Sequence, residues 1–125
     1  AWHDTERALS EVKPGRTRLD KAALQGGGAL PATSFMEAHY FQNDSFMAPD
    51  QLLHEAGRLR GIPGVIVQGR YDLLCPPATS AALAEVWQEA EIRVVEAAGH
   101  NLYDPGIRDA VMKAISDVAS RVAAP

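Results

Sequence analysis

The chain has 125 residues, of which 46% are hydrophobic and 22% charged, so it can build the core of one ordinary domain. This hydrophobic content and a net charge of −4 exclude a disordered chain, and an isoelectric point near 5.5 excludes electrostatic binding of nucleic acid. No apolar run approaches the roughly 20 residues of a membrane helix, and no signal peptide is visible, so we expect no membrane partner. The single cysteine, Cys75, excludes a disulfide scaffold and suits a reducing, cytoplasmic location.

The first 60 residues predict helices separated by irregular segments. A helix over residues 2–9 is broken by Lys13-Pro14-Gly15. Residues 16–28 end in three glycines, but no Lys-Ser/Thr pair follows them, which favours a flexible loop over a phosphate-binding loop. Two further helices begin near Pro31 and Pro49.

The remaining residues, 61–125, predict strand, helix, strand and helix in that order. The strands are residues 64–69 and 91–96, and the helices are residues 78–87 and 106–122. Neither strand shows polar alternation, which is typical of strands covered on both faces. The crossover is long enough for a parallel βαβ unit, so we predict the α/β class. We expect Leu83, Val86 and Trp87 to face inward from the first helix. In the second helix, the apolar residues that recur at three and four positions are Val111, Ile115, Val118 and Val122.

Two side chains that can hold or move a proton follow the two predicted strands. Asp72 comes shortly after the first strand, and His100 comes shortly after the second. Parallel strands present their carboxyl ends at one edge of a sheet, so these loops can bring a carboxylate and an imidazole together. Such a pair can activate a nucleophile, and the order matches the end of the Ser, Asp, His order of α/β-hydrolases. The alternative is that Asp72 is a turn residue and His100 a solvated loop residue.

The nucleophile that such a pair would serve is missing. None of the serines lies in a Gly-x-Ser-x-Gly elbow between a strand and a helix. Cys75 is only three residues beyond Asp72, on the same loop, so we expect it to line a pocket rather than to attack a substrate. We expect neither a cofactor nor a metal ion.

Several short segments carry a family resemblance. They are Trp2 with Glu6, Glu37-Ala38-His39-Tyr40-Phe41, Gly69-Arg70-Tyr71-Asp72 with Cys75-Pro76, Trp87-Gln88-Glu89-Ala90-Glu91, and Ala98-Gly99-His100 with Asp104-Pro105. Together they resemble the bacterial proline iminopeptidases (prolyl aminopeptidases), which are α/β-hydrolases with a helical cap. The resemblance implies that residues 1–60 derive from the cap and residues 61–125 form the carboxyl-terminal part of the hydrolase core.

The same resemblance implies a role for five residues. Asp72 would be the acid and His100 the base of a Ser-His-Asp triad, with the serine outside this chain. Glu6 and Glu37 would receive the free amino terminus of a peptide that begins with proline, and Cys75 would line the proline pocket. Two carboxylates near one point favour a cation, whereas an internal amide nitrogen would leave both unmatched. The alternative for Glu6 and Glu37 is that they are ordinary exposed helix residues.

Two other functions remain open at this point. The chain could be a non-catalytic module, or it could be part of another capped α/β-hydrolase such as an esterase or an epoxide hydrolase. Because two parallel strands leave backbone groups unpaired at their outer edges, we expect the chain either to self-associate or to pair with a missing amino-terminal portion.

Overall fold

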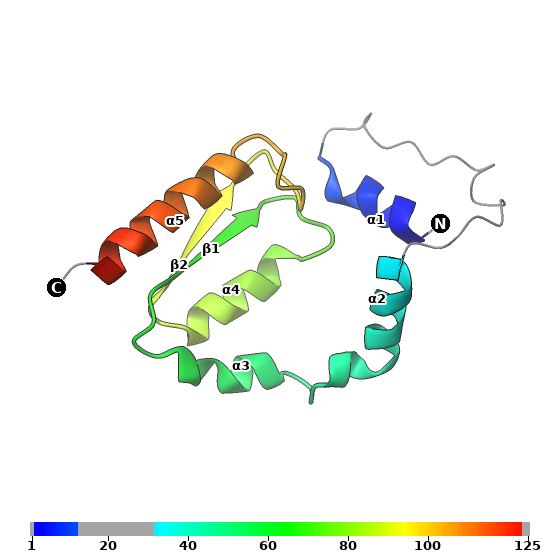
Figure 1. Ribbon diagram of the computed structural model, residues 1–125, viewed down its shortest axis with the longest axis horizontal. Coiled ribbons are helices and arrows are strands. Elements are labelled where there is room, and N and C mark those ends of the chain that lie inside the picture. The colour runs from blue at the N-terminus through cyan, green and yellow to red at the C-terminus, as the bar shows by residue number, and fades with distance from the viewer. Residues whose placement is uncertain (1, 13–31, 124–125) are drawn as a thin grey trace.

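The computed structural model describes residues 2–12 and 32–123 (Figure 1). The break at Lys13-Pro14-Gly15, the loop over residues 16–28 and the helix start at Pro31 lie outside the described residues. The helical elements before the first strand are α1 (Trp2–Ser10), α2 (Ala32–Gln42), the 3-10 turn η2 (Asp44–Phe46), α3 (Gln51–Glu55) and the 3-10 turn η3 (Ala56–Leu59). The helix that we predicted to begin near Pro49 is therefore divided into α3 and η3.

The second part of the chain has the predicted order of strand, helix, strand and helix. The elements are β1 (Gly64–Gly69), α4 (Pro77–Val86), β2 (Ala90–Val95) and α5 (Ile107–Ala123). β1 and β2 are parallel neighbours, with Gly64 opposite Ala90 and Gly69 opposite Val95. α4 begins at Pro77, and because proline has no N–H, this first position carries no amide donor that would lack a helix partner. The predicted α/β class is confirmed as a mixed helix and parallel-sheet unit.

The two long helices of this unit lie on opposite sides of the small sheet, α4 on one and α5 on the other (Figure 1). Gly64 allows the indole of Trp87, just after α4, to pack directly on the start of β1, because a Cβ at this position would overlap the ring. The indole Nε1 of Trp87 also donates a hydrogen bond to the carbonyl of Ile62 at 2.9 Å. α4 is thus fixed to the amino-terminal end of the sheet.

Ion pairs fix α5 to β2. The guanidinium of Arg93 on β2 bonds Glu91 and Asp117, each at 2.7 Å, and Arg121 bonds Glu91 at 3.1 Å. Hydrogen bonds from Arg93 and Arg121 lower the pKa of Glu91 from 4.5 to about 2. This network crosses from the strand to the helix and sets where α5 lies.

The hydrophobic core of the described residues is thin. Its buried hydrophobic members are Ala56, Ala98, Ile107 and Ala114, and no large side chain among the described residues is fully buried. Val86, which we predicted to face inward, is 44% exposed, and Ile115 and Val122 of α5 are 59% and 68% exposed. A sheet of two strands is too narrow to cover both helices, so it leaves an open apolar groove of about 680 Å³ along β1 and α5.

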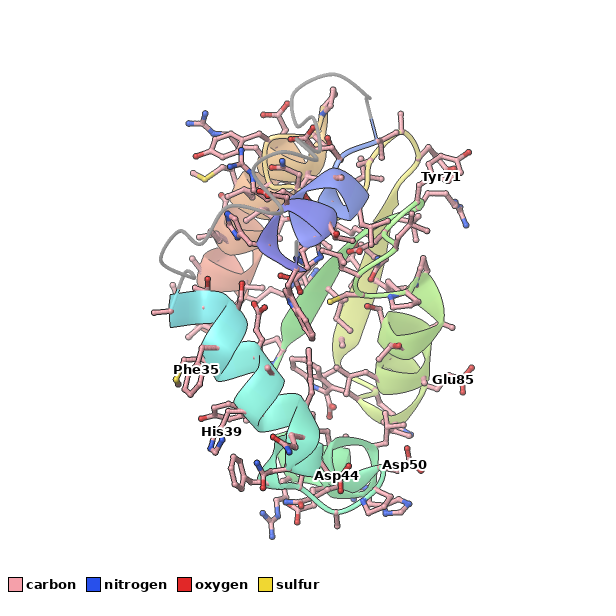
Figure 2. The ribbon with its side chains drawn as sticks, turned by 90° about the vertical axis from the view of Figure 1, so that its right-hand side faces the viewer. Phe35, His39, Asp44, Asp50, Tyr71 and Glu85 are labelled. Carbon is pink, nitrogen blue, oxygen red and sulfur yellow. The ribbon has the colours of Figure 1, made fainter. Side chains whose placement is uncertain are left out.

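The helices before the sheet also leave apolar side chains exposed. Phe35 is 70% exposed, and it projects outward from α2 together with His39 (Figure 2). α1 lies near the carboxyl ends of the strands (Figure 1). It is joined there to the loop after β2, because the Asn101 amide donates to the Ser10 carbonyl at 3.1 Å. The division of the chain at residue 60 stays a prediction.

Candidate active site

The loop that leaves β1 holds Asp72 in one orientation. Its Oδ1 accepts hydrogen bonds from the backbone amides of Leu74 at 3.0 Å and Cys75 at 2.8 Å. A short Asp side chain that bonds amides two and three residues ahead closes a local turn, which is why this residue type is favoured there. The side chain is only 7% exposed, and its second oxygen, Oδ2, remains for another partner.

That partner is His100, on the loop that leaves β2. Its Nδ1 lies 3.0 Å from Asp72 Oδ2. Because a carboxylate can only accept, this hydrogen bond places the imidazole proton on Nδ1 and leaves Nε2 as the nitrogen that can take a proton. The His100 side chain is 44% exposed, so its ring is open on one side while the carboxylate behind it is buried. The structure therefore brings together the two residues that the sequence placed after consecutive strands.

The two loops approach closely because of hydrogen bonds and one glycine. The Arg70 amide donates to the Val95 carbonyl at 3.0 Å, and the Tyr71 amide donates to the Ala98 carbonyl at 2.9 Å. A Cβ at Gly69 would overlap the carbonyl oxygen of Gly99 and lie 2.7 Å from that of Ala98. The last residue of β1 must therefore be glycine for the Asp72 and His100 loops to meet.

Glu6 and Glu37 come together in a second place, near the same loop. Glu6 is on α1 and Glu37 on α2, and both line an open hollow of about 260 Å³. Glu37 Oε2 accepts a hydrogen bond from the indole Nε1 of Trp2 at 2.9 Å. The other lining residues are His3, Arg7, Ser10, Thr33 and Leu74. Leu74 belongs to the loop that holds Asp72, so the hollow adjoins that loop.

Cys75 directly follows Leu74, which lines this hollow, but Cys75 is not itself a lining residue. Partial burial raises the pKa of the Cys75 thiol above its usual range, and the negative charge of Asp72 adds a smaller effect in the same direction. A raised pKa reduces the thiolate fraction at neutral pH, which is the opposite of what a nucleophilic cysteine needs. Its role in lining a proline pocket stays a prediction.

One partner was not identified from the sequence. Trp2 was singled out only by resemblance, and its bond to Glu37 joins residues 35 positions apart. No local pattern signals such a contact.

Within residues 2–12 and 32–123, no group of three or more His, Cys, Asp or Glu side chains is arranged to hold a metal ion. In the same ranges, no helix combines the length and apolar character needed to cross a membrane.

The described residues thus form a parallel α/β unit that carries a carboxylate–imidazole pair at the carboxyl ends of its strands. Comparison with known proteins gives the family. The chain is 39% identical over 123 residues to a proline iminopeptidase of Neisseria gonorrhoeae, covering 98% of this chain and 37% of that protein. It is 40% identical over 119 residues to the Neisseria meningitidis serogroup B protein of the same name, and 36% identical over 108 residues to one from Arabidopsis thaliana. No family model matches the chain.

The chain is therefore related to the proline iminopeptidases over nearly its whole length, as its motifs predicted. It spans about a third of the length of these relatives: 37%, 36% and 28% of the three in the order named above.

Proposed function

We propose that this chain supplies the acid and the base of a serine aminopeptidase that releases proline from the amino terminus of peptides. The observation that carries the proposal is the bond of 3.0 Å between His100 Nδ1 and the buried carboxylate of Asp72, in a relative of the proline iminopeptidases. Residues 61–125 then form the carboxyl-terminal part of an α/β-hydrolase core, and residues 1–60 derive from its cap. The nucleophilic serine belongs to polypeptide outside these 125 residues. The single unpaired cysteine suits a peptidase of the reducing cytoplasm.

The reaction follows from the free ring nitrogen. His100 Nε2 takes the proton of the serine hydroxyl as the serine oxygen attacks the prolyl carbonyl carbon. Asp72 keeps the ring in the correct tautomer and stabilises the imidazolium that forms. The imidazolium then gives its proton to the leaving amine, so the peptide bond breaks and an acyl-enzyme remains. Water then attacks the acyl carbon while His100 takes its proton. His100 returns the proton to the serine oxygen as the ester bond breaks, and free proline is released.

The substrate is selected at the hollow between α1 and α2. Glu6 and Glu37 give it two negative charges and Arg7 one positive charge, so one negative charge remains in excess. A free prolyl amine is a cation at neutral pH and fits this charge, whereas an internal amide nitrogen does not. The indole of Trp2 fixes the direction of the Glu37 carboxylate. Cys75 contributes to the proline pocket through the loop that it shares with Leu74.

The test uses the completed enzyme, meaning this chain joined to the polypeptide that supplies the nucleophile. A practical form is a chimera in which this chain replaces the matching segment of the Neisseria gonorrhoeae relative. We expect it to hydrolyse a proline arylamide and to reject the N-acetylated arylamide, which lacks the cationic nitrogen. Preference for a simple aryl ester over the proline arylamide would overturn the peptidase assignment in favour of another capped hydrolase.

The exposed apolar surface favours a second, compatible role in assembly. β1 pairs only with β2 among the described strands, and the groove beside it is lined by apolar side chains of β1 and α5. We propose that the polypeptide carrying the nucleophile docks at this edge, and that the chain alone self-associates there. Sedimentation at micromolar concentration is expected to show oligomers, and a folded monomer would contradict this.

A further inference from the structure

Asp104 is a buried carboxylate that the proposed reaction does not use. It is 9% exposed and lies between His100 and the start of α5. Its Oδ2 accepts a hydrogen bond of 2.7 Å from the backbone amide of Gly99, the residue directly before His100. Burying a carboxylate is costly unless it is well bonded, so this short bond to an amide needs an explanation.

The bond is not part of the cap of α5. The amide of Ile107, at the start of α5, donates to the backbone carbonyl of Asp104 at 3.2 Å, so the side chain is not needed for that contact. The side chain instead reaches back along the chain to the loop that carries the imidazole. The amide of Asp104 also donates to the carbonyl of Asn101 at 2.9 Å, which closes a tight turn directly after His100.

The backbone on both sides of His100 is therefore held. Before it, the Gly99 amide is bound by Asp104, and the Gly99 carbonyl packs against Gly69 at the end of β1. After it, the Asn101 amide donates to the Ser10 carbonyl of α1 at 3.1 Å. Of these contacts, only the one from Asp104 is made by a side chain, so it is the one that a substitution can remove without altering the backbone.

We propose that Asp104 is a positioning residue that holds the Gly99–His100 backbone so that the imidazole stays bonded to Asp72. The inference rests on the proposed function, in which that bond orients the base. Gly99 is followed directly by His100, so a change in the orientation of the Gly99 amide moves the ring. A displacement of about 1 Å at a catalytic group lowers turnover by about 10²-fold.

The experiment first follows the bond itself, in the 125-residue chain. The low-field proton NMR resonance of His100 Nδ1–H reports its hydrogen bond to Asp72, and hydrogen exchange of the β1 and β2 amides reports the fold. We compare Asp104→Ala, which removes the acceptor, with Asp104→Asn, which keeps one. Asp109→Ala is the charge-matched control, because Asp109 is an exposed carboxylate in the first turn of α5.

We expect the resonance to persist in Asp104→Asn and Asp109→Ala and to be lost in Asp104→Ala, with the strand amides still protected. A resonance that persists in folded Asp104→Ala overturns the proposal. If Asp104→Ala does not fold, Asp104→Asn decides: the proposal stands if the resonance persists and fails if it is lost.

A second readout uses the completed enzyme and separates this proposal from the proposed function. We expect Asp104→Ala to lower kcat about 10²-fold with little change in KM, and Asp104→Asn to restore most of the loss. A purely structural role would lower the amount of folded enzyme instead and leave the kcat of the folded fraction unchanged, which would overturn the proposal. A wild-type completed enzyme without peptidase activity refutes the proposed function, while the resonance still decides the role of Asp104.

Discussion

Replacing Gly69 by alanine tests whether the close approach of the loops after β1 and β2 brings Asp72 and His100 within hydrogen-bond distance. The new Cβ would overlap the Gly99 carbonyl oxygen and lie 2.7 Å from the Ala98 carbonyl oxygen, and both obstacles are backbone. The His100 loop must retreat by at least about 0.7 Å, because the Ala98 oxygen alone needs that movement to reach ordinary van der Waals contact and the Gly99 oxygen needs more. A shift of this size away from Asp72 lengthens the present 3.0 Å between Asp72 Oδ2 and His100 Nδ1 beyond hydrogen-bond range.

We expect Gly69→Ala to lower the free energy of unfolding by about 1–3 kcal/mol, the usual effect of overpacking a filled site. The matched control is Gly57→Ala, because nothing lies within 4 Å of a Cβ built at Gly57. There we expect no loss, and a gain of about 0.4–1 kcal/mol from the less flexible unfolded chain.

The assay is urea unfolding of the 125-residue chain, together with the low-field proton resonance of His100. We expect Gly69→Ala to shift the urea midpoint downward and to lose the resonance, and Gly57→Ala to keep both. If Gly69→Ala is as stable as Gly57→Ala and retains the resonance, the reasoning about loop contact is refuted.

Three further substitutions test other parts of the account. In the completed enzyme, Asp72→Asn should keep the fold and lower kcat by about 10⁴-fold, as removal of the triad carboxylate does in a serine protease, and near wild-type turnover would remove Asp72 from the triad. Glu37→Gln should lower kcat/KM for proline arylamides by at least about tenfold, mainly through KM, because it removes one charge from the amine site; an unchanged kcat/KM would end that role. Glu91→Gln tests the ion pairs between β2 and α5, because the pKa of Glu91 is depressed in the folded chain. The stabilising effect of the Glu91 carboxylate should be full above pH 4.5 and disappear as the pH falls to about 2. The urea midpoints of wild type and Glu91→Gln should therefore converge over that range. A difference between the midpoints that stays constant would contradict this prediction.

The contact between Asp72 and His100 was predictable from the sequence because the placement of each residue is local. Each follows a strand by a few residues, and the two strands are consecutive, so topology alone brings Asp72 and His100 to one edge. The structure adds the distance of 3.0 Å and the amide bonds that orient the carboxylate. It also adds the contact between Gly69 and Gly99, which depends on the separation of two loops and has no signature within either one.

The orientation of the helices was less predictable. Helical spacing placed Ile115, Val118 and Val122 on one apolar face, yet Ile115 and Val122 are 59% and 68% exposed. Periodicity gives the apolar face of a helix but not the width of the sheet beneath it, and two strands leave much of that face open. The bond between Trp2 and Glu37 escaped prediction for a related reason, because it joins two helices whose mutual packing no local pattern specifies.

The central claim is that Asp72 and His100 serve a serine supplied by other polypeptide. It is tested most directly by a crystal structure of the completed enzyme after reaction with an organophosphonate that labels serine nucleophiles. We expect the adduct on a serine outside these 125 residues, with its oxygen within hydrogen-bond distance of His100 Nε2 and Asp72 on the opposite ring nitrogen. An adduct on a serine of this chain, or a labelled serine remote from His100, would contradict the account.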